Sequence, residues 1–305
     1  MRNVVSIDLG SNSFRTLLYD GLNHKIIDEY QEVVGMADGL IDTKRISIEA
    51  QNRVIEAVKK SIEKLKFNPK DAVCVTTAAM RMAENSSEVL KRFKDECNLD
   101  FKIINGDEEA RLTLLAIKYA LKREKKESEH FALIDIGGGS TELIINNGNE
   151  YFAKSFDIGI VTLSQKYKNN QKELLNELDG RKEEITLFIE SLNINLDKFN
   201  FVATAGTPTT IAAVKLGLNF NNYDRNLING TQLTLDEIED FLHKFRTLSK
   251  EEIFDLVGGG RTDFIESGVF IFKLFYTILN KDKSIVFDDG LREGVAIDHA
   301  LKLSK

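Results

Sequence analysis

The sequence has few of the residues that build disulfide frameworks or metal clusters. Its 305 residues include only two cysteines, Cys74 and Cys97, and four histidines. Neither residue type shows the spacing of a zinc site, and two cysteines are too few for a disulfide scaffold. We therefore expect a protein of a reducing compartment, the cytoplasm.

Long apolar runs and an excess of basic charge are also missing. The most apolar long stretch, residues 264–279, contains Glu266 and Lys273 and is too short to span a bilayer. The chain begins directly with a predicted strand and shows no signal-peptide pattern. A net charge of -7 argues against a nucleic-acid binder, which would carry a basic face. We expect neither membrane nor nucleic acid as a partner, whereas a phosphate compound can still bind to backbone amides and helix N-termini.

One short pattern occurs twice. Residues 3–19 read NVVSIDLGSNSFRTLLY, and residues 131–145 read FALIDIGGGSTELII. Each copy has an apolar run, then Asp-x-Gly, a turn of small residues and a second apolar run. The apolar runs predict buried strands, and the small residues let backbone N–H groups converge on an anion. The repeat predicts two related half-domains whose turns face each other across a cleft that serves phosphoryl transfer.

The rest of the chain predicts an α/β fold with two mixed sheets, because strands and helices alternate in both halves. Further strands are expected near 25–34, 71–77, 101–105, 150–156, 201–206 and 284–289, and helices near 47–66, 78–95, 107–122, 161–193 and 263–280. The charge run KREKKESEH at 122–130 has no apolar periodicity and marks a boundary. We predict domains at 1–124 and 125–305, with the C-terminal helix, residues 291–305, able to pack on the first domain.

The two turns have the composition of phosphate sites but match no common nucleotide fingerprint. The chain has no GxxxxGK[ST] and no GxGxxG that opens a helix. The first turn, residues 10–13, could equally be a plain hairpin. The second turn has three consecutive glycines, 137–139, which cost backbone entropy that a plain hairpin does not require. Asp8 and Asp135 each place a carboxylate at the mouth of a turn.

Three other segments contain candidate site residues. Thr207 and Pro208 suit the N-cap and first position of a helix, so this segment is either a well-made helix start or a third anion site. Arg81 lies early in a helix that follows a buried strand, where α/β sheets bind ligands, although an exposed helical arginine usually has no such role. The acids at 107–109 favour a first helical turn in any protein, and spacing does not choose which of them, if any, orients a water.

Six motifs together resemble a known family. IDLGSNSFR, TTAAMRMAEN, INGDEEAR, IDIGGGSTE, an AGT turn and GLREG follow one another as in the exopolyphosphatase and guanosine pentaphosphate phosphohydrolase (Ppx/GppA) family. The resemblance covers essentially the whole chain. It implies two ribonuclease H-like domains of the actin and sugar-kinase superfamily around an interdomain cleft.

The resemblance also implies roles for individual residues. Glu109, which precedes Ala-Arg, matches the catalytic glutamate, and Asp135 and Glu142 match acids implicated in catalysis and magnesium binding. Arg81 matches an arginine that holds substrate phosphates, and Arg261 lies in a more loosely similar segment. The full set of expected phosphate-binding residues is Gly10, Ser11, Asn12, Ser13, Arg81, Gly137, Gly138, Gly139, Ser140, Thr141, Gly206, Thr207 and Arg261, and the expected metal ligands are Asp8, Asp135 and Glu142.

The implied activity is hydrolysis of the terminal phosphate of polyphosphate or of guanosine pentaphosphate, a stringent-response nucleotide, with Mg²⁺ or alternatively Mn²⁺. Two other functions stay open: an ATP-dependent small-molecule kinase of the same superfamily, and a non-catalytic sensor of guanosine tetra- or pentaphosphate. A homodimer is also left open. The chain stops at residue 305, without the C-terminal helical domains of long family members and without a His-Asp dipeptide. We therefore expect distributive action, with short substrates hydrolysed at least as efficiently as long polymers.

Overall fold

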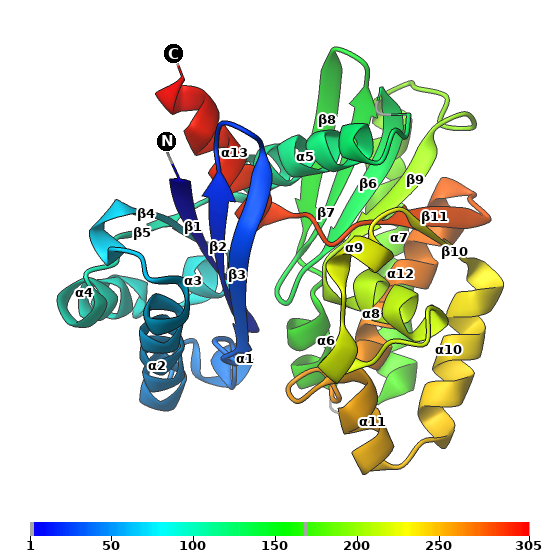
Figure 1. Ribbon diagram of the computed structural model, residues 1–305. Helices are drawn as coiled ribbons and strands as arrows, with labels where there is room; N and C mark the ends of the chain where they lie inside the picture. The colour runs from blue at the N-terminus through cyan, green and yellow to red at the C-terminus, as the bar shows by residue number, and fades with distance from the viewer. Residues whose placement is uncertain (1–2, 128, 168–169, 305) are drawn as a thin grey trace. The chain divides into compact units, whose positions relative to one another are not determined.

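The computed structural model describes residues 3–127, 129–167 and 170–304, and its chain divides into two compact units (Figure 1). Unit 1 comprises Met1–Ala116 and Gly290–Lys305, and unit 2 comprises Ile117–Asp289. The chain thus leaves unit 1 within helix α5 (Gly106–Arg123), earlier than the charge run at 122–130, of which residue 128 lies outside the described residues. Residues 290–305 lie in unit 1 rather than in the second domain of the predicted division.

Unit 1 is built on a five-stranded sheet of order β3-β2-β1-β4-β5. Strand β1 is antiparallel to β2 and parallel to β4, β2 is antiparallel to β3, and β4 is parallel to β5. The strands are β1 (Asn3–Leu9), β2 (Ser13–Asp20), β3 (Lys25–Val33), β4 (Ala72–Thr76) and β5 (Phe101–Ile103). Strand β1 is buried from Val4 to Leu9, as expected for a central strand covered on both faces.

Helices cover this sheet. Besides α5 they are α1 (Leu40–Thr43), α2 (Ile48–Leu65), η1 (Pro69–Asp71), α3 (Ala78–Met82), α4 (Ser86–Cys97) and α13 (Leu291–Leu303). The predicted helix at 78–95 is two helices, because the buried Asn85 side chain binds the N–H and C=O of Ile46 at 2.9 and 3.0 Å. Helix α13 packs against β1, β2 and β4, and its Leu291 and Val295 share a core with Val75 of β4.

Unit 2 repeats this architecture. Its sheet has the order β10-β11-β9-β6-β7-β8, in which β8-β7-β6-β9-β11 corresponds to β3-β2-β1-β4-β5. The strands are β6 (His130–Ile136), β7 (Thr141–Asn147), β8 (Glu150–Phe156), β9 (Asn200–Thr204), β10 (Thr231–Thr234) and β11 (Lys283–Val286). In both units three antiparallel strands are followed by parallel ones, so the predicted α/β fold with two mixed sheets is confirmed.

The helices of unit 2 gather around α12, which packs against α6, α7, α8, α10 and β6. They are α6 (Ile160–Tyr167), α7 (Gln171–Ser191), α8 (Gly206–Lys215), η2 (Phe220–Asn222), α9 (Arg225–Ile228), α10 (Leu235–Thr247), α11 (Lys250–Val257) and α12 (Ile265–Leu279). Residues 168–169, inside the predicted helical stretch 161–193, lie outside the described residues. Across the described part of the chain, we find no helix long and apolar enough to cross a membrane.

Candidate active site

The glycine turn between β6 and β7 has the geometry of an anion-binding backbone. The C=O of Gly137 accepts a hydrogen bond from Ile160 at 3.0 Å, and that of Gly138 accepts from Val161 at 2.9 Å, both at the start of α6. A trans peptide unit points its N–H opposite to its C=O. The N–H groups of Gly138 and Gly139 therefore point away from α6, the arrangement in which successive amides can bind one anion.

Gly159, which sequence reasoning missed, makes this geometry possible. A Cβ at Gly159 would lie 2.3 Å from the carbonyl oxygen of Gly138 and 2.4 Å from the carbonyl carbon of Gly139. Only a glycine lets the residue before α6 lie directly against the turn. In the sequence Gly159 is a glycine just before the helix predicted near 161–193. Glycines at such positions are too common to indicate a role in a site.

The turn between β1 and β2 in unit 1 has the same arrangement, in which its carbonyls accept hydrogen bonds from a later segment. The C=O of Ser11 accepts from Ala37 at 2.8 Å, and the C=O of Asn12 accepts from Val34 at 2.8 Å and Gly35 at 3.0 Å. The N–H groups of Asn12 and Ser13 therefore point away from the segment that follows β3. Both turns also close in the same way: Gly10 N–H donates to Ser13 O at 3.0 Å, and Gly137 N–H donates to Ser140 O at 2.9 Å.

The two predicted acids of unit 2 lie side by side in a polar row across the sheet. In the strand register Asp135 lies opposite Glu142 on one side and Thr204 on the other, and Glu142 lies opposite Ser155. Glu142 is 1% exposed, and its Oε1 accepts hydrogen bonds from the hydroxyls of Ser140 at 2.8 Å and Ser155 at 2.7 Å.

Two hydroxyls that were predicted to bind phosphate are used inside unit 2. Ser140 donates to Glu142, and Thr141 Oγ1 donates to the C=O of Ile158 at 2.5 Å. Both residues are buried, so these hydroxyls hold an acid and the β8–α6 link in place. Within the turn, the outward amides of Gly138 and Gly139 are the groups with the geometry of a phosphate site.

The predicted acid of the first hairpin has a different neighbour. Asp8 is 8% exposed, and in the register it lies opposite Arg15 on β2 and next to Val75 on β4. A cation thus stands opposite Asp8 at the position where Asp135 has a second carboxylate.

Arg81 and Glu109 are brought together in unit 1. The guanidinium Nη1 of Arg81 lies 2.9 Å from Glu109 Oε2 and also donates to the C=O of Ile104 at 2.8 Å. Both side chains are partly exposed, 24% for Arg81 and 12% for Glu109. They lie beyond the carboxyl ends of the parallel strands β4 and β5, where open α/β sheets bind ligands.

The neighbouring Glu108 forms an ion pair with Arg111 instead. Its two oxygens accept from Arg111 at 2.7 and 3.0 Å, and these hydrogen bonds hold the pKa of Glu108 below its usual range. Arg111 also bonds Asp298 of α13 at 2.9 Å, so this group fixes helix α13 to α5. Of the three acids that spacing left open, Glu109 is the one that contacts Arg81.

The start of α8 differs from the prediction. The N-cap is Ala205, at a φ of 75°, and Gly206 is the first helical residue, so the expectation of Thr207 as N-cap is wrong. Thr207 is fully buried, and its Oγ1 has no hydrogen-bond partner among the described residues. The chain turns into the helix before Thr207 because the C=O of Ala205 already accepts from Thr209 N–H and Oγ1, at 3.3 and 2.9 Å.

Arg261 lies beside this helix start. Its Nη1 donates to Thr210 Oγ1 at 3.2 Å, and a Cβ on Gly206 would lie 3.7 Å from the Arg261 Cζ. A guanidinium next to a helix N-terminus favours an anion at that position. Gly206 and Arg261 therefore belong to one group, and Thr207 contributes at most its backbone.

Asp135 and Glu142 of unit 2 supply only part of the ligands that a magnesium ion needs. The described residues contain no cluster of three or more His, Cys, Asp or Glu side chains that could enclose a metal. Mg²⁺ is commonly held by one or two carboxylates, with water and substrate phosphates completing the octahedron. The neighbouring carboxylates of Asp135 and Glu142, beside a phosphate-type turn, match that donor set.

Comparison with known proteins identifies a family for this chain. The model of the Ppx/GppA phosphatase family matches residues 19–303. The chain belongs to the Ppx/GppA phosphatase family. The Aquifex aeolicus member of the family, solved by crystallography, is similar at 29% identity and a TM-score of 0.77 over 99% of both chains. A structure of an exopolyphosphatase from Cytophaga hutchinsonii, at 22% identity and a TM-score of 0.85 over 99% of this chain and 98% of that one, shares the fold.

One similar curated protein is longer than this chain. The bifunctional 3-dehydroquinate synthase/phosphatase of Fusobacterium nucleatum is 29% identical over 312 residues, which cover 96% of this chain and 46% of the relative. The chain thus spans about half the length of that relative.

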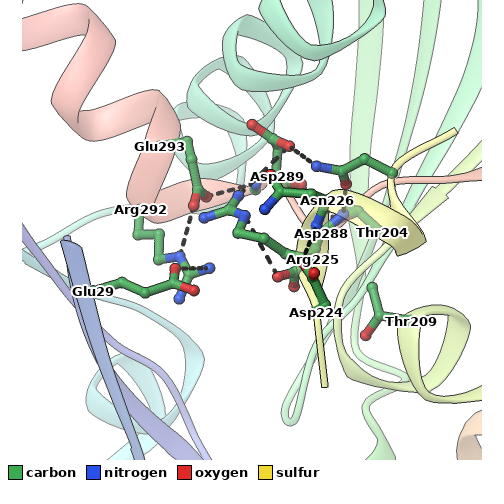
Figure 2. Close-up of polar contacts among 12 residues, drawn as sticks. Glu29, Thr204, Thr209, Asp224, Arg225, Asn226, Asp288, Asp289, Arg292 and Glu293 are labelled. Atoms are coloured by element: carbon green, nitrogen blue, oxygen red, sulfur yellow. Dashed lines mark hydrogen bonds and ion pairs between the residues drawn. The ribbon is translucent and has the colours of Figure 1, made fainter. Parts of the chain in front are cut away.

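The GLREG motif of this Ppx/GppA chain serves packing in unit 1. Arg292 is 2% exposed and lies between Glu29 at 2.8 Å and Glu293 at 2.7 Å (Figure 2). Glu293 also accepts the N–H of Gly290 at 2.9 Å, which caps α13. A Cβ on Gly294 would lie 2.0 Å from the C=O of Leu112, so this glycine lets α13 and α5 approach closely.

A second polar cluster fixes the end of β11 in unit 2. Asp289 is buried and accepts from both terminal nitrogens of Arg123 at 3.1 and 2.8 Å and from Asn229 at 3.0 Å. Arg225 lies 3.5 Å from the same carboxylate (Figure 2). The C=O of Asp289 accepts the Thr204 hydroxyl at 2.6 Å. This cluster therefore anchors the Thr204 end of the polar row.

Proposed function

We propose that this Ppx/GppA phosphatase releases terminal orthophosphate from a phosphoanhydride chain, either inorganic polyphosphate or guanosine pentaphosphate. The observation that supports it best is the duplicated turn. In each unit the segment after the third strand binds the turn carbonyls, successive amides point outward, and an aspartate precedes the turn. Family membership supports a hydrolase that acts on a phosphate compound.

In the proposed reaction each unit binds phosphate oxygens with its own groups, which are the turn amides and Arg81 in unit 1 and the turn amides and Arg261 in unit 2. Phosphoryl transfer spreads charge over the equatorial oxygens, so that positioning and electrostatics supply most of the catalysis. A phosphate that binds Arg81 competes with Glu109 for the same guanidinium. The Glu109 carboxylate then accepts the proton of the attacking water, a role for general bases in hydrolysis.

Asp135 and Glu142 are the residues that would hold Mg²⁺ or Mn²⁺ beside the glycine turn. The bound cation would neutralise charge that develops on the phosphate oxygens. The chain's own residues orient the phosphates, exclude water from around Glu142 and position Glu109 as the general base.

A side-by-side assay of phosphate release tests the proposal. The substrates are short polyphosphate, long polyphosphate and guanosine pentaphosphate, each with water as sole acceptor. Release from at least one of them, with a ladder of intermediate lengths in a partial polyphosphate digest, is the expected result. Turnover that requires ATP and a second acceptor would identify a kinase instead, and tight nucleotide binding without turnover would identify a sensor.

A further inference from the structure

Ser155 of β8 lies outside every motif that the sequence singled out, yet it contacts a predicted catalytic acid. Its Oγ donates to Glu142 Oε1 at 2.7 Å, and it lies directly opposite Glu142 in the β7–β8 register. Strands β9, β6, β7 and β8 follow one another in the sheet (Figure 1). In the register Ser155 therefore ends the polar row that runs through Thr204, Asp135 and Glu142.

Glu142 needs such a partner because it stands next to another carboxylate. Two like charges directly opposite on neighbouring strands repel each other. Glu142 is also 1% exposed, so water does little to stabilise its charge. Two hydroxyl donors on the same oxygen, Ser140 at 2.8 Å and Ser155 at 2.7 Å, compensate for that loss and fix the rotation of the carboxylate.

The two serines differ in what else they do. Ser140 is part of the glycine turn, and its C=O closes the turn through Gly137. A change at Ser140 therefore alters the phosphate site as well. Ser155 is on the strand across from Glu142, so its hydroxyl can be removed without changing the turn sequence.

We propose that Ser155 is a positioning residue that holds Glu142 in the orientation needed to bind a divalent cation. The inference rests on the proposed function for its effect on turnover, but the cation-binding part can be measured alone. Partners of metal ligands set affinity by fixing ligand orientation, and their loss typically lowers affinity about 10–100-fold.

The test compares an isosteric pair, Ser155→Thr and Ser155→Val, which differ only in the hydroxyl. The first readout is the Kd of Mn²⁺ alone, measured by calorimetry on the full chain. The second is the Mg²⁺ concentration that gives half-maximal phosphate release. We expect Ser155→Val to raise both about 10-fold, with kcat at saturating Mg²⁺ largely recovered and with Ser155→Thr close to wild type.

Ser284→Ala is the matched control. Ser284 is fully buried in β11 of the same unit and accepts the hydroxyl of Tyr276 at 2.7 Å, away from the polar row. Its loss should lower stability and leave Mn²⁺ affinity unchanged. Unchanged Mn²⁺ affinity in Ser155→Val, or an equal loss in Ser284→Ala, would overturn the proposal. A wild type that turns over no substrate, with Mn²⁺ affinity that still depends on the Ser155 hydroxyl, would refute the proposed function alone.

Discussion

The two hairpins of this protein have the same backbone and opposite electrostatics. β1–β2 and β6–β7 close with equivalent hydrogen bonds, and in both the turn carbonyls are bound by the segment that follows the third strand. At the aspartate the two diverge: Asp8 lies opposite Arg15, whereas Asp135 lies opposite Glu142. At this level of the sheet the first hairpin therefore contains side chains of both charge signs, and the second contains two carboxylates.

The same contrast holds for the other site residues. In unit 1 the predicted base, Glu109, contacts Arg81, and its neighbour Glu108 contacts Arg111. In unit 2 the two acids lie opposite each other in the register, and Glu142 is held by two serine hydroxyls. The two units therefore share a fold but not the charged residues of their sites. We expect unit 1 to set the rate of water attack and unit 2 to set the metal requirement.

The largest expected effect is that of Glu109→Gln. The amide cannot accept the proton of water, so kcat for phosphate release should fall about 10²–10⁴-fold at every Mg²⁺ concentration. Glu108→Gln is the control, because Glu108 binds Arg111 and should affect mainly stability. If Glu108→Gln lost turnover while Glu109→Gln kept it, the assignment of the base would be wrong.

Gly159→Ala should come next. The added Cβ meets the backbone of Gly138 and Gly139, which must shift, and loss of preorganised donors typically costs about 10²–10³-fold in kcat. The control is Gly35→Ala, at the corresponding place in unit 1. Its Cβ meets the carboxylate of Asp38 rather than the turn, and its φ of 53° makes the change mainly a stability loss. Equal activity losses in the two variants would remove the distinction between the turns.

The pair Glu142→Gln and Arg15→Gln tests the electrostatic difference directly. Glu142→Gln should raise the Mg²⁺ concentration for half-maximal activity at least about 10-fold. It should also raise the Tm measured without metal, because it relieves repulsion from Asp135. Arg15→Gln should lower the metal-free Tm and leave the Mg²⁺ requirement nearly unchanged.

Activity of the wild type that persists in excess chelator would refute a metal role for unit 2.

The smallest effect concerns acid stability. Glu177 of α7 accepts from the Tyr167 hydroxyl at 2.8 Å, which with Lys166 and Arg181 lowers the pKa of Glu177 to about 2. A lowered folded-state pKa stabilises the fold above the ordinary value of 4.5, and this stability is lost as pH falls toward 2. Glu177→Gln should destabilise unit 2 by about 1 kcal/mol at neutral pH and weaken its pH dependence in that range.

Hydrogen exchange resolved by segment is the suitable measurement for Glu177→Gln, because two units need not unfold in one step. Faster exchange confined to α6 and α7 would support the expectation. Faster exchange in the β1–β5 sheet instead would show that stability is not partitioned between the units.

Local sequence patterns predicted most of the strands and the hairpin repeat. The strands on either side of each turn lie where the apolar runs within 3–19 and 131–145 predict them, because apolar runs and small-residue turns are local signals. The capping boxes that start α10 and α11, at Thr234 and Ser249, are local in the same sense, because their donors and acceptors lie three residues apart. Glu109 could be selected from its neighbours only through the family resemblance.

The features that sequence missed depend on residues far apart in the chain. Asn85 divides a helix because it binds Ile46, and Ser155 matters because β8 pairs with β7. Gly159 is required by its approach to Gly138, and the wrong N-cap at Thr207 followed from a cap preference that the backbone of Ala205 overrides. None of these contacts leaves a periodic signal.

Unit 1 is discontinuous in the chain, so that its fold cannot be completed before residues 290–305 have been synthesised. The surface of Val75 and Ile104 that α13 covers cannot be closed until Leu291 and Val295 have been made. The ribosome first produces all of unit 2, Ile117–Asp289, which takes roughly 9–35 s at the usual rate of about 5–20 residues per second. The later half of the molecule can therefore complete its fold first. Throughout that interval the nascent N-terminal sheet exposes an apolar face, and we expect it to be a client of ribosome-associated chaperones.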